Sequence, residues 1–246
     1  MIEEYTRKFY ISYTSADRKI NLSLVNAMSM IQDMMTEYFG KLKSDNIFLK
    51  KENNAIWVLT KTKVHFNSYP KWNDIIEGTA FTVKVTPIRV ETEVDFRNKE
   101  GKLLFYAKQE SCVIDLESRK LRKIKTVNYP VDIKTKESTN DIPYLKLKEE
   151  FLDTDKVYEQ KIYSSDIDFS YHTNNVVYVR YILNSLNCDF LDNCIITDIE
   201  IHYIEETKEG QNLKIYRKIK DNEIEFLIKE KEREIVRARL KYINDK

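Results

Sequence analysis

The same order of predicted elements occurs twice along this chain of 246 residues. In each half a strand comes first, one apolar helix follows, and several strands come after the helix. The helices are predicted over residues 22–40 and 174–186. Both are apolar over much of their circumference, which indicates helices enclosed by sheet. The predicted fold class is therefore α+β, with antiparallel strands in each half.

The strands are predicted from runs of β-branched and aromatic residues separated by turn residues. They are Lys8–Tyr13, Ala55–Phe66, Thr79–Val90, Glu93–Arg97 and Leu103–Asp115 in the first half, and Tyr158–Tyr163, Ile195–Tyr203, Asn212–Ile219, Glu223–Glu230 and Arg233–Tyr242 in the second. The order of elements suggests an internal repeat with an offset of 150, the separation of Tyr13 from Tyr163 (163 − 13) and of Ser15 from Ser165 (165 − 15).

The two halves are joined by a charged and polar stretch that contains Pro130 and Pro143. Its composition predicts a long surface connection, with one helical stretch at Tyr144–Leu152. The predicted organisation is an N-terminal domain over residues 1–128, a linker over 129–156 and a C-terminal domain over 157–246.

The composition excludes several classes of function. With 41 basic and 40 acidic side chains, the chain lacks the basic field of a nucleic-acid binder. The three cysteines contain no CxxC pair, so we predict reduced thiols and no metal site. Four glycines form no phosphate-binding loop, and no cofactor is predicted. Because neither a signal peptide nor a membrane-length apolar run is present, we expect a cytoplasmic protein without a membrane partner.

A cluster of polar side chains precedes the second helix. Within eight residues the chain carries the carboxylate of Asp168, the hydroxyl of Ser170, the imidazole of His172 and the amides of Asn174 and Asn175. Carboxylates and imidazoles are the groups that transfer protons in general acid–base catalysis, and a helix start supplies amides that bind negative charge. The cluster therefore predicts a site and not a packing motif.

Five segments in a fixed order carry a resemblance to a known family. They are Ile56–Thr60, Tyr69–Asp74, Ser118–Ile124, Asp168–Tyr178 and Glu200–Glu206. In this order the chain resembles the FatA/FatB-type acyl-ACP thioesterases. The resemblance implies a double hot-dog fold, in which two antiparallel sheets each wrap round a long central helix. It also implies that the N-terminal domain supplies the acyl pocket and the C-terminal domain the catalytic residues.

The resemblance assigns catalytic roles to Asp168, Ser170, His172 and Glu206. The family motif reads Asp-x-Asn-x-His, so Ser170 stands where the family has asparagine. The implied reaction is hydrolysis of fatty acyl-ACP to free fatty acid and ACP, in fatty acid biosynthesis. A carboxylate activates water, His172 orients the carboxylate or the thioester, and helix amides near Asn174 and Asn175 stabilise the oxyanion. Whether Glu206 or Asp168 is the base stays open.

Other features bear on substrate and mechanism. Thr207 occupies the position beside Glu206 where plant relatives often carry cysteine, which argues against a cysteine nucleophile. The first half has no counterpart of His172, so we expect one active site per chain. Met28 and Trp57 are candidates for the acyl-pocket lining, and Asn174 and Asn175 for substrate binding, although Met28 and Trp57 are equally suited to an ordinary core.

The densest basic run is expected to contact the acidic carrier protein, and a solvated strand end is the alternative. Its members are Arg119, Lys120, Arg122, Lys123 and Lys125. Unpaired sheet edges are compatible with a homodimer. An acyl-CoA thioesterase of the same fold and a non-catalytic acyl-thioester-binding protein are the alternative functions.

Overall fold

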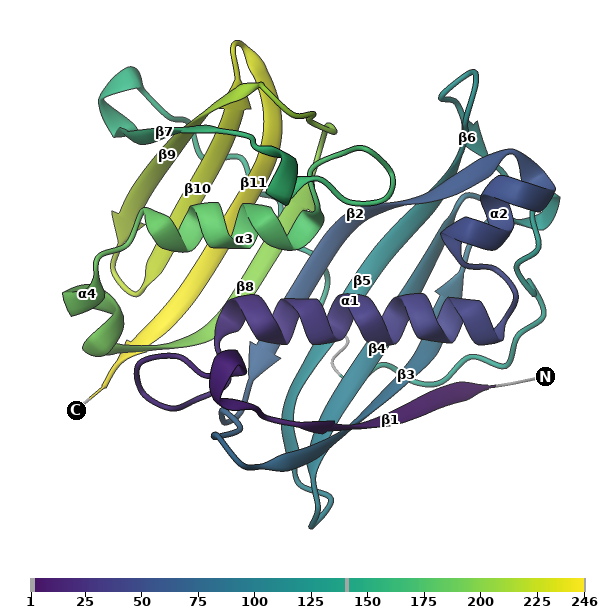
Figure 1. The fold of residues 1–246 in the computed structure, drawn as a ribbon, viewed down its shortest axis with the longest axis horizontal. Coiled ribbons are helices and arrows are strands. Elements are labelled where there is room, and N and C mark those ends of the chain that lie inside the picture. Colours follow the sequence, from purple (N-terminus) through teal and green to yellow (C-terminus); the bar gives the residue numbers. More distant parts are fainter. Residues whose placement is uncertain (1–2, 140–141, 246) are drawn as a thin grey trace. The chain divides into compact units, whose positions relative to one another are not determined.

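The computed structural model describes residues 3–139 and 142–245, and the chain divides into two compact units. Unit 1 is Met1–Pro143 and unit 2 is Tyr144–Lys246. Each unit consists of an antiparallel sheet with few helices (Figure 1). In the part of the chain that is described, no helix combines the length and the apolar character needed to cross a membrane.

Unit 1 contains six strands and two α-helices within its described residues. In chain order they are β1 (Glu4–Tyr10), α1 (Leu24–Lys41), α2 (Asn46–Asn53), β2 (Ala55–Phe66), β3 (Ile75–Val85), β4 (Arg89–Asn98), β5 (Leu103–Asp115) and β6 (Leu121–Arg122). The strand order is β1-β3-β4-β5-β2, and β6 pairs with β5.

The core of unit 1 lies between α1 and one face of its sheet. The helix packs on β1, β3 and β4, and its apolar side chains, including Met28, are buried. A Cβ atom at Gly78 would lie only 2.8 Å from the ring of Phe96 and 3.3 Å from the sulfur of Met34. Glycine therefore allows the long helix to approach β3 closely.

Unit 2 repeats this plan with a shorter helix. Its elements are β7 (Lys156–Lys161), α3 (Asn175–Asn184), α4 (Cys188–Asp192), β8 (Cys194–Tyr203), β9 (Asn212–Lys220), β10 (Glu223–Glu230) and β11 (Arg233–Asn244), and the strand order is β8-β11-β10-β9-β7. Figure 1 shows α3 lying across one face of this sheet. The hydroxyl of Tyr158 on β7 donates to the carbonyl of Tyr181 on α3 at 2.5 Å, which ties the helix to the edge strand.

Two predictions about elements are wrong. The strand predicted at Thr79–Val90 is interrupted after Val85 by a turn that contains Pro87, and the chain resumes in β4. Tyr144–Leu152 is not helical. Its backbone instead binds side chains of the unit 2 sheet: Leu145 N donates to Glu200 at 2.7 Å, and Arg237 donates to the carbonyl of Glu149 at 2.7 Å.

The repeat also has a different register from the one predicted. The helices begin at Leu24 and Asn175, which are 151 positions apart (175 − 24), and the short 3₁₀ turns before them begin at Tyr13 and Ser164, with the same separation (164 − 13). The offset of 150 was therefore wrong by one residue. This change decides which residue of the first half corresponds to His172.

Candidate active site

The loop before α3 is anchored to that helix by Asp166. Its carboxylate is 3% exposed, accepts hydrogen bonds from Tyr163 N at 2.9 Å and from the Tyr181 hydroxyl at 2.8 Å, and pairs with Arg180. Burial, followed by the hydrogen bond to this carboxylate, raises the pKa of Tyr181, so the phenol stays a hydrogen-bond donor. The motif that follows therefore starts from a fixed point.

Asp168 shapes the next turn of the loop. One carboxylate oxygen accepts a hydrogen bond from Ser170 N at 2.8 Å, and Asp168 N donates to the carbonyl of His172 at 2.9 Å. Tyr171 adopts a left-handed backbone conformation, with φ of 62°. The chain thus reverses direction between Asp168 and His172, as a side-chain-to-backbone turn at aspartate allows.

His172 faces the carboxylate of Glu206. The Nε2 atom of His172 lies 3.4 Å from Oε2 of Glu206, and the two side chains are 19% and 31% exposed. Glu206 follows β8 in the connection to β9, so two segments of unit 2 that are distant in sequence bring the pair together. A partly exposed carboxylate beside an imidazole is suited to accept a proton from water.

Three hydroxyl groups form a network beside this pair in the chain, because Thr173 follows His172 and Thr207 follows Glu206. The Thr207 Oγ1 atom lies 2.7 Å from Thr173 Oγ1 and 2.8 Å from the Tyr178 hydroxyl. All three residues are buried, and Thr207 is 0% exposed. Burial is the largest cause that raises the pKa of Tyr178; hydrogen bonds with Thr207 and Thr173 oppose the rise, and the Glu206 carboxylate adds to it. Tyr178 is therefore a neutral hydroxyl group.

The start of α3 has most of its amides already engaged. The side chain of Asn174 caps the helix by accepting from Val176 N at 2.9 Å, and Asn174 N donates to the carbonyl of Asp166 at 2.9 Å. Val177 N donates to the carbonyl of Asn174, also at 2.9 Å. Of the amides expected to bind an oxyanion, that of Asn174 is thus committed to the fold, and Asn175 occupies the first helical position.

The two predicted pocket residues of the first half belong to the core of unit 1. Met28 is 3% exposed and Trp57 is 8% exposed. The Trp57 indole N–H donates to the carbonyl of Ser44 at 2.6 Å, and its ring lies 4.9 Å from that of Phe39. Both are buried members of unit 1, whereas Asp168, Ser170, His172 and Glu206 belong to unit 2.

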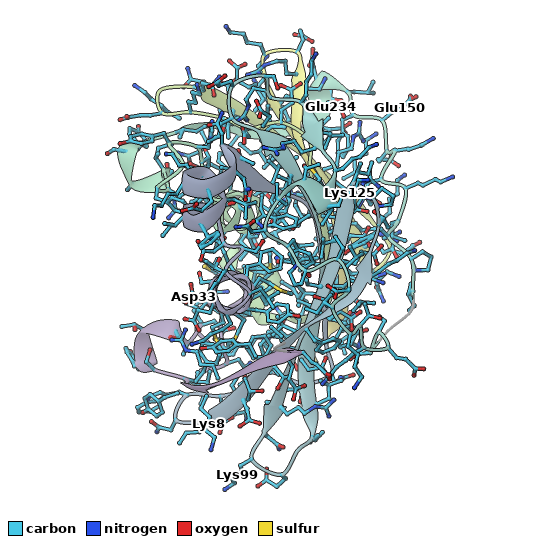
Figure 2. All side chains as sticks on the ribbon, turned by 90° about the vertical axis from the view of Figure 1, so that its right-hand side faces the viewer. Lys8, Asp33, Lys99, Lys125, Glu150 and Glu234 are labelled. Atoms are coloured by element: carbon cyan, nitrogen blue, oxygen red, sulfur yellow. The ribbon has the colours of Figure 1, made fainter. Side chains whose placement is uncertain are left out.

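The predicted basic run is not uniform. Arg122 is half-buried and donates to the carbonyls of Asn53 at 2.5 Å and Thr126 at 3.0 Å, so it joins the end of α2 to the segment after β6. Lys120, Lys123 and Lys125 are exposed, and Lys125 is labelled in Figure 2. These lysines and Arg119, which is also exposed, are accessible to a partner, whereas Arg122 is engaged in hydrogen bonds within unit 1.

Unit 1 contains a loop of the same shape without the catalytic pair. Asp17 N donates to the carbonyl of Asn21 at 2.7 Å, as Asp168 N does to His172, and Leu22 N donates to the carbonyl of Pro70 at 2.7 Å, as Thr173 N does to Thr207 at 2.9 Å. Asn21 therefore takes the place of His172. By the same correspondence, Tyr69 takes the place of Glu206.

Thr173 and Tyr178 were missed by reasoning from the sequence, although both lie within or beside the polar motif. Threonine at a helix start and tyrosine within a helix are common in ordinary packing, and only the return of the chain at Thr207 brings the three hydroxyls together. The signal in the sequence is Thr207, a polar residue beside Glu206.

Family models match both halves of the chain. One described as the acyl-ACP thioesterase N-terminal domain matches residues 3–128, and one described as the acyl-ACP thioesterase C-terminal domain matches residues 149–245. A chloroplastic acyl-[acyl-carrier-protein] hydrolase, FATB1, from Cuphea viscosissima is 24% identical over 63% of this chain and 38% of its own length. A second from the same plant, FATB3, is 22% identical over 66% of this chain and 40% of its own length. The matches thus span less than half of either plant relative.

Solved structures show the same fold. An acyl-ACP thioesterase from Bacteroides thetaiotaomicron superposes with a TM-score of 0.90, covers 98% of both chains and is 18% identical. The 12:0-ACP thioesterase from Umbellularia californica superposes with a TM-score of 0.85, covers 100% of this chain and 99% of its own, and is also 18% identical. The predicted resemblance is confirmed, and so is a fold of the hot-dog type. This chain belongs to the acyl-ACP thioesterase family.

Proposed function

We propose that the chain hydrolyses the thioester of fatty acyl-ACP and releases a free fatty acid and the ACP thiol. Membership of the family and the names of its relatives support the substrate class. The observation that carries the chemistry is the pairing of His172 with Glu206, 3.4 Å apart and both partly exposed. An imidazole and a carboxylate in contact, open to solvent, can take a proton from a water molecule.

In the proposed mechanism Glu206 is the base and His172 orients it. Glu206 accepts a proton from water as the water oxygen attacks the thioester carbonyl carbon. The oxyanion that forms is stabilised by the amide of Asn175 at the start of α3, where the helix dipole is positive. Collapse of this intermediate breaks the C–S bond. The thiolate leaves readily, because a thiol has an ordinary pKa of about 8.5, and it takes the proton from Glu206, which becomes a carboxylate again.

The finer description of the fold belongs to the same proposal. We propose that the two sheet-and-helix units form a double hot-dog, with an N-terminal domain over residues 1–128, a linker over 129–156 and a C-terminal domain over 157–246. The helices α1 and α3, each accompanied by an antiparallel sheet, support this description. In this proposal Met28 and Trp57 line the acyl pocket, and the basic run 119–125 contacts the acidic carrier through its exposed lysines.

The function is tested by His172→Ala and Glu206→Gln, assayed on acyl-ACP substrates of several chain lengths. Loss of a proton-transfer group reduces turnover by about 10²- to 10⁴-fold, and misplacement of one by about 100-fold, so each variant should lose activity on every chain length. The matched control is Asn21→Ala, at the corresponding position of unit 1, which should keep its turnover. Circular dichroism checks that all three variants are folded.

Near-parental turnover in both His172→Ala and Glu206→Gln would refute the mechanism. Acyl-CoA carrying the same acyl chain should be assayed in parallel. A higher kcat/KM on acyl-CoA than on acyl-ACP would replace the proposed carrier, and no hydrolysis of either thioester would favour a binding function.

A further inference from the structure

The peptide around Glu206 is held on both sides. On one side, Ile204 N donates to the carbonyl of Ile235 on β11 at 2.9 Å, and Glu205 pairs with Arg233 at 2.7 Å. On the other side, Thr207 lies 0% exposed against the start of α3. Glu206 itself follows the end of β8, so the position of its carboxylate depends on these flanking residues.

The three hydroxyl groups around Thr207 can form one continuous chain of hydrogen bonds that runs from Tyr178 through Thr207 and Thr173 to the Thr207 carbonyl. Thr173 Oγ1 also lies 3.4 Å from the carbonyl oxygen of Thr207, to which it can donate. Thr207 then donates to Thr173 Oγ1 at 2.7 Å, and Tyr178 donates to Thr207 Oγ1 at 2.8 Å. Each of the three protons has an acceptor in this arrangement, which is the condition for a favourable buried network.

Unit 1 shows that the loop does not need these hydroxyls in order to fold. With the offset of 151, the positions of Thr173 and Tyr178 correspond to Leu22 (173 − 151) and Ala27 (178 − 151), and that of Thr207 corresponds to Pro70 through the shared backbone hydrogen bond. None of these three residues has a hydroxyl group, and all are buried. The same backbone connection forms in both units, but the hydroxyl network is present in the unit that has the histidine and the glutamate.

We infer that Thr207 is a positioning residue, which holds Glu206 against His172 through its hydrogen bonds with Tyr178 and Thr173. This inference rests on the proposed function, because it assigns Glu206 to catalysis. Thr207 is fully buried and both sides of its hydroxyl are occupied, so it does not act as a nucleophile. The Glu206 carboxylate also contributes to the raised pKa of Tyr178, which places its charge near the network.

The test compares Thr207→Val, which keeps the shape but removes the hydroxyl, with Thr207→Ser, which keeps the hydroxyl. A small misplacement of a catalytic group can reduce turnover by about 100-fold, so Thr207→Val should lower kcat by about 10- to 100-fold and leave KM unchanged. Thr207→Ser should recover most of kcat. Tyr178→Phe removes the other end of the network and should also lower kcat, so the inference stays testable if Thr207→Val fails to fold.

The matched control is Thr82→Val in unit 1. The hydroxyl of Thr82 is likewise buried and lies 2.9 Å from that of Tyr38 and 2.7 Å from that of Tyr129. Thr82→Val should lower the melting temperature about as much as Thr207→Val does, without lowering kcat. A fall in kcat of the same size in Thr82→Val would show that the effect of Thr207→Val comes from general destabilisation, and would overturn the inference.

A second readout does not depend on activity. The nitrogen NMR shifts of the His172 imidazole report which ring nitrogen carries the proton, and a hydrogen bond to a carboxylate fixes that choice. The parental chain and Thr207→Ser should show mainly the form with the proton on Nε2, and Thr207→Val a mixture. If the parental chain hydrolyses no thioester, the proposed function fails and this comparison alone decides the positioning role. An unchanged tautomer together with unchanged kcat in Thr207→Val would overturn it.

Discussion

Asp168 stabilises the same kind of backbone turn as Asp17 does in the corresponding loop of unit 1. Its carboxylate accepts a hydrogen bond from Ser170 N, and in unit 1 the carboxylate of Asp17 accepts from Lys19 N and Asn21 N at 2.8 and 3.0 Å. The unit 1 loop has an aspartate at this position although it lacks the histidine, so the role of Asp17 is to hold the backbone. The geometry therefore favours Glu206 as the base and Asp168 as the residue that shapes the loop.

The two roles of Asp168 predict different outcomes for Asp168→Asn. An asparagine oxygen can accept the same backbone hydrogen bond but cannot take up the proton of water. We expect Asp168→Asn to keep most of the turnover on acyl-ACP, and Asp168→Ala to lose about tenfold or more because the loop relaxes. Steady-state kinetics of the two variants measure this difference. An equal and nearly complete loss in both would identify Asp168 as the base.

At the level of single residues, the sequence motif identified the catalytic candidates but not the contacts between side chains. Asp168, His172 and Glu206 could be named from the resemblance, but the network of Thr173, Tyr178 and Thr207 could not. Hydroxyl groups have little sequence signature, because threonine and tyrosine serve in cores, caps and strands alike. The catalytic role that the resemblance gives Ser170 stays a prediction; in the structure its backbone N–H donates to the carboxylate of Asp168.

The two central helices begin with caps of the same kind. The Ser23 hydroxyl accepts from Asn26 N at 3.2 Å at the start of α1, and the Asn174 side chain accepts from Val176 N at 2.9 Å at the start of α3. The helix start in unit 2 has a second proposed task, because it places the amide of Asn175 for the oxyanion. Removal of the two caps should therefore have similar effects on stability and different effects on activity.

We expect Asn174→Ala and Ser23→Ala each to lower the free energy of unfolding by about 1 kcal/mol, the usual cost of a lost N-cap. Asn174→Ala should in addition lower kcat, whereas Ser23→Ala should not. Urea denaturation and turnover measured on the same preparations test both expectations. Equal turnover in the two variants would remove the start of α3 from the proposed mechanism.

Several strands were predicted with their bounds, whereas the short helices were not predicted. The runs at Ala55–Phe66, Leu103–Asp115 and Glu223–Glu230 have the predicted bounds, because each contains β-branched and aromatic residues and ends next to turn residues. The helices α2 and α4 were missed, since eight and five residues are too few for a clear helical period. The helix predicted at Tyr144–Leu152 failed because tertiary hydrogen bonds to Glu200 and Arg237 determine its backbone.

The chain as a whole is nearly neutral, so attraction of an acidic partner would depend on local groups of positive charge such as the exposed lysines of the run 119–125. An acidic carrier would be attracted to them at long range, and this attraction affects association more than the chemical step. Arg122 is not suitable for a mutational test of this attraction, because it donates hydrogen bonds to the end of α2 and to Thr126, and its loss would disturb the fold.

We expect Lys120→Glu combined with Lys123→Glu to lower kcat/KM for acyl-ACP, with a smaller loss at high salt because screening weakens the repulsion. A small thioester without a carrier should be hydrolysed at the parental rate. The control is Lys99→Glu with Lys102→Glu, two exposed lysines at the turn between β4 and β5, which should leave both activities unchanged. Equal losses on the carrier and the small thioester would remove the run from docking.

Ile20 and Tyr171 have φ angles of 58° and 62° at corresponding positions of the two loops. A left-handed conformation costs a residue other than glycine about 1–3 kcal/mol, and β-branched isoleucine adopts it especially rarely. The two side chains share neither size nor chemistry, yet the chain path at this point is the same. The two halves therefore share backbone angles at positions where their amino acids no longer match. A comparison of dihedral angles would align such a repeat correctly, whereas a comparison of amino-acid identities places it one residue out of register.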